Sequence, residues 1–363
     1  MAAMEELLVV SGRGACRVAV GTGLLGRPGT VREAAAGSRI LTVSDTTVAP
    51  LHARAAAQAL GVGPVLALPA GERHKTWEQV ARILREALAR GLARDGVFVG
   101  IGGGVVTDMT GFAASIFMRG IPWIAVPTTV LAMVDAAIGG KTGINLPEGK
   151  NLAGTFWSPR MVVADVATLV TLPGREVRAG LAEVVKAAWI GDRELLERLD
   201  PPPPVDAGER WTEIVIRAIR VKAGIVERDE REGGLRKVLN LGHTVGHALE
   251  AATGYRRFLH GEAVAWGMLA AARIAAGRGL LSANGIEALE RAVEGLAPLP
   301  PVDDLGLDAL LPFIGRDKKR GPDGVGWVLP VDDGVVRDQV VGENELARAW
   351  EAVRRECGRM VGR

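Results

Sequence analysis

The chain has 363 residues, of which 48% are hydrophobic and 24% are charged, and its formal net charge is +2 at pH 7. This length is enough for two domains with a core each, and so small a net charge gives no indication of binding to nucleic acid or to a membrane. The two cysteines, Cys16 and Cys357, stand at opposite ends and make no disulfide framework, which is typical of a cytoplasmic protein. The first six residues are acidic rather than basic, so we expect no secretory signal.

The first half of the sequence alternates short apolar runs with helical patterns. We expect helices at residues 49–60 and 77–90, and strands at residues 17–20, 39–44, 65–68, 96–101 and 121–127. Short apolar strands separated by helices predict a mainly parallel sheet that is covered on both faces. Such sheets bind ligands at the carboxyl ends of their strands, so we look for a site there.

A glycine-rich turn, Gly102-Gly-Gly-Val-Val-Thr-Asp108, follows the strand at 96–101 and precedes an apolar helix. Glycines at such a turn let the backbone approach a pyrophosphate and point amide N–H groups toward it. The spacing is not Gly-x-Gly-x-x-Gly, so a plain tight turn is the alternative. Further candidate cofactor contacts follow other predicted strands, namely Asp45, residues 71–75, Thr128 and Thr129.

A second glycine-rich stretch covers residues 135–151 and contains Lys141, Lys150 and Asn151. Its Gly139-Gly-Lys-Thr segment resembles part of an ATP-binding loop, but Asp135 stands where the first glycine of that motif is required. The two lysines could bind an anionic group. The alternative is a solvated loop with ordinary lysines.

From about residue 172 the pattern becomes helical, and Thr171-Leu-Pro-Gly marks the change. We expect domains at 1–172 and 173–363. In the second domain we expect a small hairpin after Gly326, a last helix from about residue 343, and helices at 176–190, 208–227, 239–252, 261–279 and 283–295. Glu183 and Lys186 lie three residues apart on the first of these helices, where a surface ion pair is the simplest explanation.

Three of the five histidines, His243, His247 and His260, fall within residues 235–262. His243 and His247 are four apart, which places both imidazoles on one face of a helix, and His260 follows a break at Gly254. Imidazole is a common zinc ligand, and a catalytic zinc usually takes three protein ligands. Capping or core histidines are the alternative, and spacing alone does not show which of the three would bind a metal.

Several of these stretches together resemble the 3-dehydroquinate synthase family of sugar-phosphate cyclases. The resemblance extends from about residue 40 to 330 and implies an α/β Rossmann-like N-terminal domain followed by an α-helical C-terminal domain. The motifs that carry it stand in the order of the family: Gly102-Gly-Gly-Val with Asp108, Met118-Arg119-Gly, Val126-Pro-Thr-Thr, Gly139-Gly-Lys-Thr-Gly-Ile-Asn, Gly149-Lys-Asn-Leu, Leu181-Ala-Glu-Val-Val-Lys, residues 239–250, His260-Gly-Glu and Asp317-Lys-Lys.

The resemblance also implies roles for individual residues. It makes Glu183, His243 and His260 the zinc ligands and leaves His247 to handle protons. The NAD contacts that it implies are Asp45, Glu72, Lys75, Gly103, Gly104, Val105, Asp108, Thr128, Thr129, Lys141 and Lys150. The substrate contacts that it implies are Arg119, Lys141, Lys150, Asn151, Lys186, Lys222, Arg236, Asn240 and Lys318.

The implied activity converts 3-deoxy-D-arabino-heptulosonate 7-phosphate to 3-dehydroquinate and phosphate, a step of the shikimate pathway that leads to chorismate and the aromatic amino acids. The implied course is transient oxidation by NAD, phosphate elimination, reduction, ring opening and aldol closure, so the net reaction is that of a lyase. The metal is zinc, with Co²⁺ as an alternative. A homodimer is implied as well, because the family's arginine that matches Arg119 reaches across a dimer interface. The rival functions are another sugar-phosphate cyclase, a metal-dependent polyol dehydrogenase of the glycerol-dehydrogenase type, and a non-catalytic scaffold or sensor.

Overall fold

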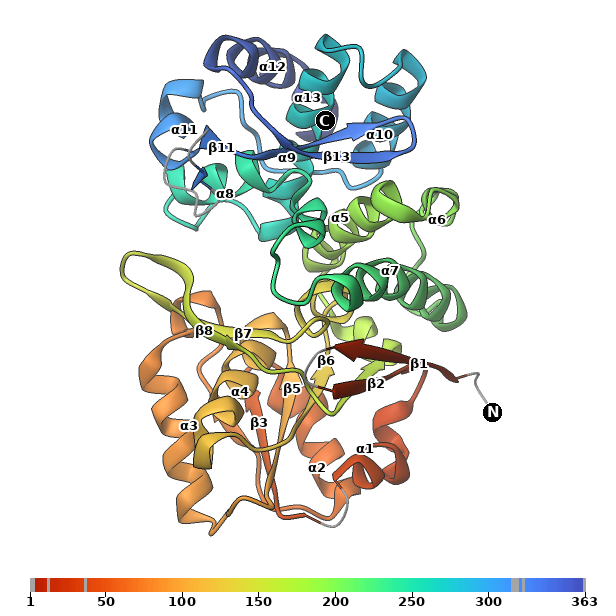
Figure 1. Cartoon of the computed structure of the whole chain (residues 1–363). Helices are drawn as coiled ribbons and strands as arrows, with labels where there is room; N and C mark the ends of the chain where they lie inside the picture. The colour runs from red at the N-terminus through yellow and green to blue at the C-terminus, as the bar shows by residue number, and fades with distance from the viewer. Residues whose placement is uncertain (1–3, 12–13, 36–37, 315–319, 322–323, 362–363) are drawn as a thin grey trace. The chain divides into compact units, whose positions relative to one another are not determined.

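The computed structural model describes residues 4–11, 14–35, 38–314, 320–321 and 324–361, and Figure 1 draws the whole chain. The chain divides into two compact units. The first unit comprises Met1–Pro173 and Pro204–Arg231, and the second comprises Gly174–Pro203 and Glu232–Arg363. The sequence suggested a single boundary at residue 172. In the structure, Pro204–Arg231, which contains one long helix, also belongs to the first unit.

A seven-stranded sheet forms the centre of the first unit, in the order β1-β2-β9-β6-β5-β3-β4. Strand β1 pairs antiparallel with β2, and all the other pairs in this sheet are parallel. The five strands expected from the sequence are present, while β1 and β9 were not expected. The strands are β1 (Met4–Ser11), β2 (Gly14–Gly21), β3 (Ile40–Asp45), β4 (Leu66–Leu68), β5 (Val97–Gly102), β6 (Trp123–Pro127) and β9 (Met161–Asp165).

Helices cover both faces of this sheet, as its continuous apolar strands require. Strand β5 is buried along its whole length: Val97, Val99 and Ile101 pack in one cluster with α1 and α2, while Gly100 faces α4. The helical elements of the first unit are η1 (Leu24–Gly26), α1 (Pro28–Ala35), η2 (Ala49–Ala53), α2 (Arg54–Leu60), η3 (Glu72–His74), α3 (Trp77–Ala89), α4 (Gly104–Ile116), η4 (Phe117–Arg119), η5 (Ala132–Ala136), η6 (Val166–Thr171) and α7 (Gly208–Arg228).

Helix α7 belongs to the first unit because its apolar face packs against β1, β2 and η5. Its buried side chains include Trp211, Ile214 and Ile219, which recur at the spacing of one helix face. The helix itself was expected from this spacing. Its partner was not, because β1 lies about 200 residues earlier in the chain.

The glycine-rich stretch at 135–151 is mostly a hairpin rather than the expected loop. Strands β7 (Lys141–Leu146) and β8 (Gly149–Phe156) pair antiparallel, with a register shift between Ile144 and Leu146. A Cβ on Gly143 would lie 2.6 Å from the carbonyl oxygen of Ala153, so glycine here allows a close approach of the two strands. The glycines that suggested a loop are therefore partly a requirement of strand packing.

The second unit is built around the long helix α9 (His260–Gly277), which is buried on nearly every side and contacts α5, α8, α10, α12 and β12. The expected helix at 239–252 is divided at Gly242, whose φ of 79° is left-handed. The other elements are α5 (Gly174–Gly191), α6 (Glu194–Glu197), η7 (Leu235–Asn240), α8 (His243–Ala252), α10 (Ala283–Glu294), α11 (Leu307–Ile314), β10 (Arg320–Gly321), β11 (Gly324–Val325), β12 (Trp327–Val331), β13 (Gly334–Gln339), α12 (Glu343–Glu356) and α13 (Gly358–Val361). Among the described residues, no helix is both long enough and apolar enough to span a membrane.

Two glycines let α9 approach its neighbours at backbone distance. A Cβ on Gly261 would lie 1.7 Å from the carbonyl oxygen of Ala179 on α5. A Cβ on Gly267 would lie 1.8 Å from the carbonyl oxygen of Gly242, which precedes α8. Both contacts are with backbone atoms, so neither can be relieved by moving a flexible side chain.

We therefore expect Gly261→Ala to lower the free energy of unfolding by about 3 kcal/mol or more, because α9 must move away from α5. Gly277→Ala is the matched control, since Gly277 is exposed at the end of the same helix and its added Cβ would meet nothing within 4 Å. This control should raise the free energy of unfolding by up to about 1 kcal/mol, because alanine has a higher helix propensity than glycine. Urea unfolding of the three proteins tests the prediction, and equal effects of the two substitutions would contradict it.

Candidate active site

The glycine-rich turn opens a helix at the carboxyl edge of the sheet. Strand β5 ends at Gly102, Gly103 precedes α4, and Gly104 is its first residue. The Thr128 amide donates to the Gly102 carbonyl at 2.9 Å, so the end of β6 lies beside this turn. A Cβ on Gly103 would lie 3.3 Å from Cγ2 of Thr129. Backbone amides at the start of α4 thus form an anion-binding edge that a side chain would crowd.

Two other predicted cofactor contacts lie at strand ends near this edge. Thr128 is buried, and its hydroxyl has no hydrogen-bond partner within the part of the chain that the structure describes. Such a buried hydroxyl is ready to bind a ligand. Asp45 ends β3, where its Oδ1 accepts hydrogen bonds from the amides of Thr47 and Val48, both at 2.8 Å.

Lys75 is the centre of a polar network in the first unit. Its side chain is 4% exposed, and its Nζ donates to Asp108 Oδ2 at 2.5 Å and to Asn151 Oδ1. Burial acts to lower the pKa of Lys75, but the charges of Asp108 and Glu72 outweigh it and raise the pKa above its usual value. Lys75 is therefore a cation. The network brings together four residues that the resemblance named: Glu72, Lys75, Asp108 and Asn151.

The remaining named residues of the first unit have different surroundings. Lys222 on α7 donates to Asp135 of η5, at 2.6 Å to its carbonyl oxygen and at 2.5 Å to Oδ1. Lys141 is exposed at the start of β7, and Lys150 is half-buried on β8. Arg119 is exposed at the end of η4 with a φ of 70°, which is left-handed.

Three candidate metal ligands meet in the second unit. Glu183 lies on α5, His243 is the first residue of α8, and His260 is the first residue of α9. Each residue offers one ligand atom, and these atoms all lie within 4.8 Å of one another. Glu183 Oε1 is 4.0 Å from His243 Nε2 and 3.7 Å from His260 Nε2. One carboxylate and two imidazoles suit a divalent metal such as zinc.

The hydrogen bonds around these three residues fit a metal. His243 Nδ1 is 3.1 Å from the Leu241 carbonyl oxygen, and His260 Nδ1 is 3.1 Å from Glu250 Oε2. Both acceptors keep the imidazole proton on Nδ1, which leaves the Nε2 lone pairs directed toward Glu183.

Glu183 is 2% exposed. Lys186 forms an ion pair with its Oε2, yet neither carboxylate oxygen accepts a well-formed hydrogen bond from a described residue. A buried carboxylate facing two nitrogen lone pairs needs a cation between them. The residues present therefore fit a divalent metal.

His247 belongs to a second group of three, with Glu250 and His260. Its ring centroid is 5.3 Å from that of His243 and 5.8 Å from that of His260, and its side chain is exposed. His260 is common to both groups. The histidine cluster expected from the sequence thus forms, and His247 is its exposed member.

Other residues named by the resemblance also lie in the second unit. Lys186 is 3% exposed and Arg236 on η7 is 2% exposed, so both cations are removed from solvent. Asn240 donates through Nδ2 to Glu232 Oε1 at 2.8 Å. Lys318 lies outside the described residues. The expected surface ion pair of Glu183 and Lys186 is wrong in one respect, because both side chains are buried.

Comparison with known proteins shows the family of this chain. The model of the 3-dehydroquinate synthase N-terminal family matches residues 65–179, and that of the C-terminal family matches residues 180–320. A 3-dehydroquinate synthase of Gloeobacter violaceus is 49% identical over 284 residues, which cover 77% of this chain and 79% of that protein. The chain belongs to the 3-dehydroquinate synthase family. The recognition made from the sequence motifs is confirmed.

Solved structures of other sugar-phosphate cyclases share the fold. A 2-deoxy-scyllo-inosose synthase, complexed with carbaglucose-6-phosphate, NAD⁺ and Co²⁺, has a TM-score of 0.83 and 26% identity, covering 97% of this chain and 99% of its own. A 2-epi-5-epi-valiolone synthase from Streptomyces hygroscopicus, with NAD⁺ and Zn²⁺ bound, has a TM-score of 0.82 and 29% identity, covering 93% and 96%. The expected fold class of a Rossmann-like domain followed by a helical domain is confirmed.

Reasoning from sequence did not assign a role to the residues that hold these side chains in place. Glu262 accepts from Arg175 Nε at 2.6 Å and Nη2 at 2.8 Å, and from the Leu259 amide at 2.7 Å. This bidentate pair joins the start of α5 to the start of α9, beside His260. Arg175 and Glu262 are 87 positions apart, so no local signal could have paired them.

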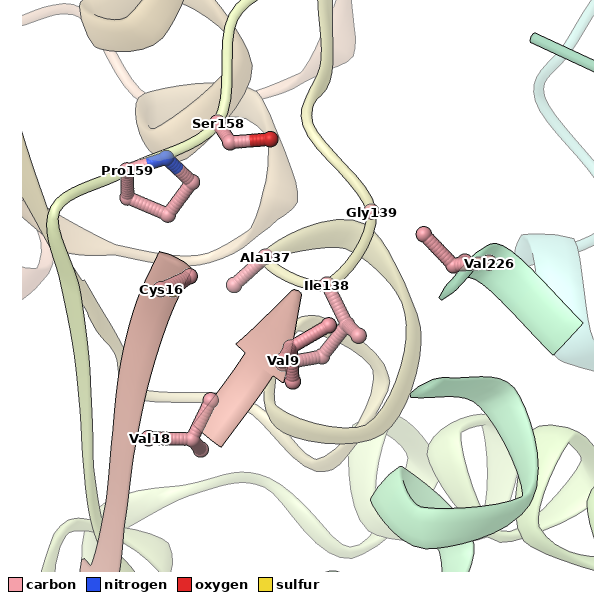
Figure 2. A pocket seen from close by; sticks show the side chains of 9 residues that line it. All are labelled: Val9, Cys16, Val18, Ala137, Ile138, Gly139, Ser158, Pro159 and Val226. Carbon is pink, nitrogen blue, oxygen red and sulfur yellow. The ribbon is translucent and has the colours of Figure 1, made fainter. Parts of the chain in front are cut away.

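A small cavity in the first unit is too small to be a binding site. Figure 2 shows it, and its volume is about 10 Å³, enough for one water at most. Its lining is mainly apolar and consists of Val9, Cys16, Val18, Ala137, Ile138, Gly139, Ser158, Pro159 and Val226.

We expect Glu250→Gln to weaken zinc binding by about tenfold or more, because the neutral amide no longer supports the Nδ1 proton of His260 with a full charge. Competition of the metal-free protein with a chromophoric chelator measures this affinity. Glu287→Gln is the matched control, since the Glu287 side chain is 66% exposed on α10. Unchanged zinc affinity in Glu250→Gln would show that the Glu250 carboxylate does not support the site.

Cys16 should be chemically inert in the folded protein. Burial raises the pKa of its thiol from 9.0 to about 12, so at mildly alkaline pH the reactive thiolate is absent. In Cys357→Ser, which retains only Cys16, we expect slow reaction with Ellman's reagent until the protein is unfolded. Fast reaction of the native variant would contradict this, and Cys16→Ser, which retains only Cys357, gives the rate of the other thiol for comparison.

Proposed function

We propose that the chain is a 3-dehydroquinate synthase that converts 3-deoxy-D-arabino-heptulosonate 7-phosphate to 3-dehydroquinate and phosphate. One observation carries the proposal within this family: the buried Glu183 carboxylate faces the Nε2 atoms of His243 and His260. A non-catalytic scaffold would have no need to keep such a set. We assign the metal to these three residues, with Zn²⁺ or Co²⁺ as in the solved cyclases.

When bound, NAD would supply reversible hydride transfer, and the metal would supply Lewis-acid chemistry. The protein's own groups bind and orient these partners. The amides at the start of α4 suit the pyrophosphate of NAD, and the buried Thr128 hydroxyl lies at the same sheet edge. We assign binding of NAD to Asp45, Glu72, Lys75, Gly103, Gly104, Val105, Asp108, Thr128, Thr129, Lys141 and Lys150.

The substrate carries a carboxylate and a phosphate, which would bind to cationic side chains that converge in an almost neutral chain. Lys186 and Arg236 are nearly fully buried, where attraction to an anion is little screened by salt. We assign binding of the substrate to Arg119, Lys141, Lys150, Asn151, Lys186, Lys222, Arg236, Asn240 and Lys318. We assign proton transfer during ring opening to the exposed His247, whose ring lies beside that of His243.

The homodimer stays a prediction from the resemblance, and the cytoplasmic location stays a prediction from the two cysteines. The place of the reaction in aromatic amino acid biosynthesis also stays a prediction from the resemblance.

The deciding measurement is phosphate release from the heptulosonate phosphate with a trace of NAD⁺, with and without a chelator. We expect far more phosphate than NAD⁺, loss of release on chelation and recovery with Zn²⁺. Glu183→Gln should lower the rate of phosphate release by about a thousandfold or more. The substitution removes a metal ligand, and a metal contributes several kcal/mol of transition-state stabilisation.

Two outcomes would contradict the proposal. Steady accumulation of NADH with a polyol, without phosphate release, would identify a polyol dehydrogenase. Phosphate release from another ketose phosphate, but not from this substrate, would identify a different cyclase. The Glu287→Gln protein serves as the control with a lost surface charge and an intact site.

A further inference from the structure

Asn145 lies at an irregularity of the β7–β8 hairpin. The pairing register shifts between Ile144 and Leu146, so Asn145 of β7 stands unpaired opposite residues 150–152, which form a bulge in β8. Such a bulge redirects a side chain out of the regular alternation and is often found beside functional sites. The side chain of Asn145 is half-buried, and both ends of its amide make hydrogen bonds.

The contacts of Asn145 reach two segments that are far apart in sequence. Its Nδ2 donates to Glu72 Oε1 at 2.7 Å, and its backbone amide donates to the Lys75 carbonyl at 2.8 Å. Its Oδ1 accepts from the Asn151 amide at 2.9 Å. One residue therefore holds the segment that follows β4 against the strand β8.

Asn151 needs this support because its backbone is left-handed, with a φ of 54°. The Asn145 side chain holds the backbone amide of Asn151. The Asn151 side chain accepts through Oδ1 from Lys75 Nζ, which also donates to Asp108. The hydrogen bonds thus close a ring through Asn145, Asn151, Lys75 and, along the backbone, Glu72. Asn145 is the member of this ring to which no role in the reaction has been given.

We propose that Asn145 is a positioning residue that holds Glu72 for NAD and Asn151 for the substrate at the same time. The inference rests on the proposed function, which assigns these two contacts. Only an amide side chain of this length can donate to Glu72 and accept from Asn151 together. Aspartate keeps the acceptor but places a second carboxylate against Glu72, and alanine removes both bonds.

Two substitutions distinguish the support that Asn145 gives to Glu72 from the support that it gives to Asn151. We expect Asn145→Asp to weaken NAD⁺ binding about tenfold, measured by calorimetry on the substrate-free protein, while the substrate KM at saturating NAD⁺ changes by less than about twofold. Asn145→Ala should weaken NAD⁺ binding and raise the substrate KM as well. Asn284→Asp is the matched control, because it adds the same charge at an exposed position of α10.

A reciprocal exchange distinguishes positioning from a general structural role. In the double variant Glu72→Gln with Asn145→Asp, the amide introduced at position 72 can donate to the new carboxylate. We expect this protein to bind NAD⁺ more tightly than the summed effects of Asn145→Asp and Glu72→Gln predict, a non-additive effect that reports direct coupling of the two side chains. Thermal unfolding of all variants shows whether the fold is kept.

The proposal is overturned if Asn145→Asp binds NAD⁺ like the wild type. It is also overturned if Asn145→Asp unfolds and Glu72→Gln does not restore the fold. A wild-type protein that binds NAD⁺ but releases no phosphate from the heptulosonate phosphate would instead refute the proposed function. Because NAD⁺ binding is measured without turnover, the two failures are distinct.

Discussion

The close packing of α9 against its neighbours is the constraint on which the candidate metal site of the second unit depends. Gly261 and Gly267 bring the backbone of α9 into contact with α5 and with the start of α8, where any side chain would collide with a carbonyl oxygen. Because α9 and α8 begin with His260 and His243, this packing places two imidazoles beside Glu183 of α5. The Arg175–Glu262 pair ties α5 and α9 together at the same end.

Buried charge in both units is held by specific partners rather than left to solvent. In the first unit, Asp108 and Glu72 keep Lys75 protonated in spite of its burial. In the second unit, Glu183 has only Lys186 as a charged partner for its Oε2 among the described residues, and its Oε1 faces two histidine nitrogens. The charges of the Lys75 network in the first unit are thus paired with one another, whereas Glu183 in the second unit can still bind a cation. This difference is what we expect if the first unit binds the cofactor and the second binds the metal.

Much of the fold followed from local patterns. Continuous apolar runs predicted the parallel strands, because both faces of that sheet are covered, and the spacing in residues 208–227 predicted α7. The misjudged segments have physical causes. Gly143 of β7 belongs to the stretch that indicated a loop, yet it allows the close approach of β8. Helix α7 was assigned to the wrong unit because its partner strand β1 was not recognised as a strand.

The sequence alone determined the family, the expected fold class and the composition of the histidine cluster, since motifs in a fixed order and residue types need no coordinates. Tertiary structure decided how these residues are held. Leu241 and Glu250 orient the two imidazoles, Arg175 reaches Glu262, and Asn145 joins Glu72 to Asn151. Two of these contacts join residues 73 and 87 positions apart, and hydrogen bonds depend on direction as well as on residue type. Spacing along a sequence carries no such information, which is why the supporting residues emerged only from the fold.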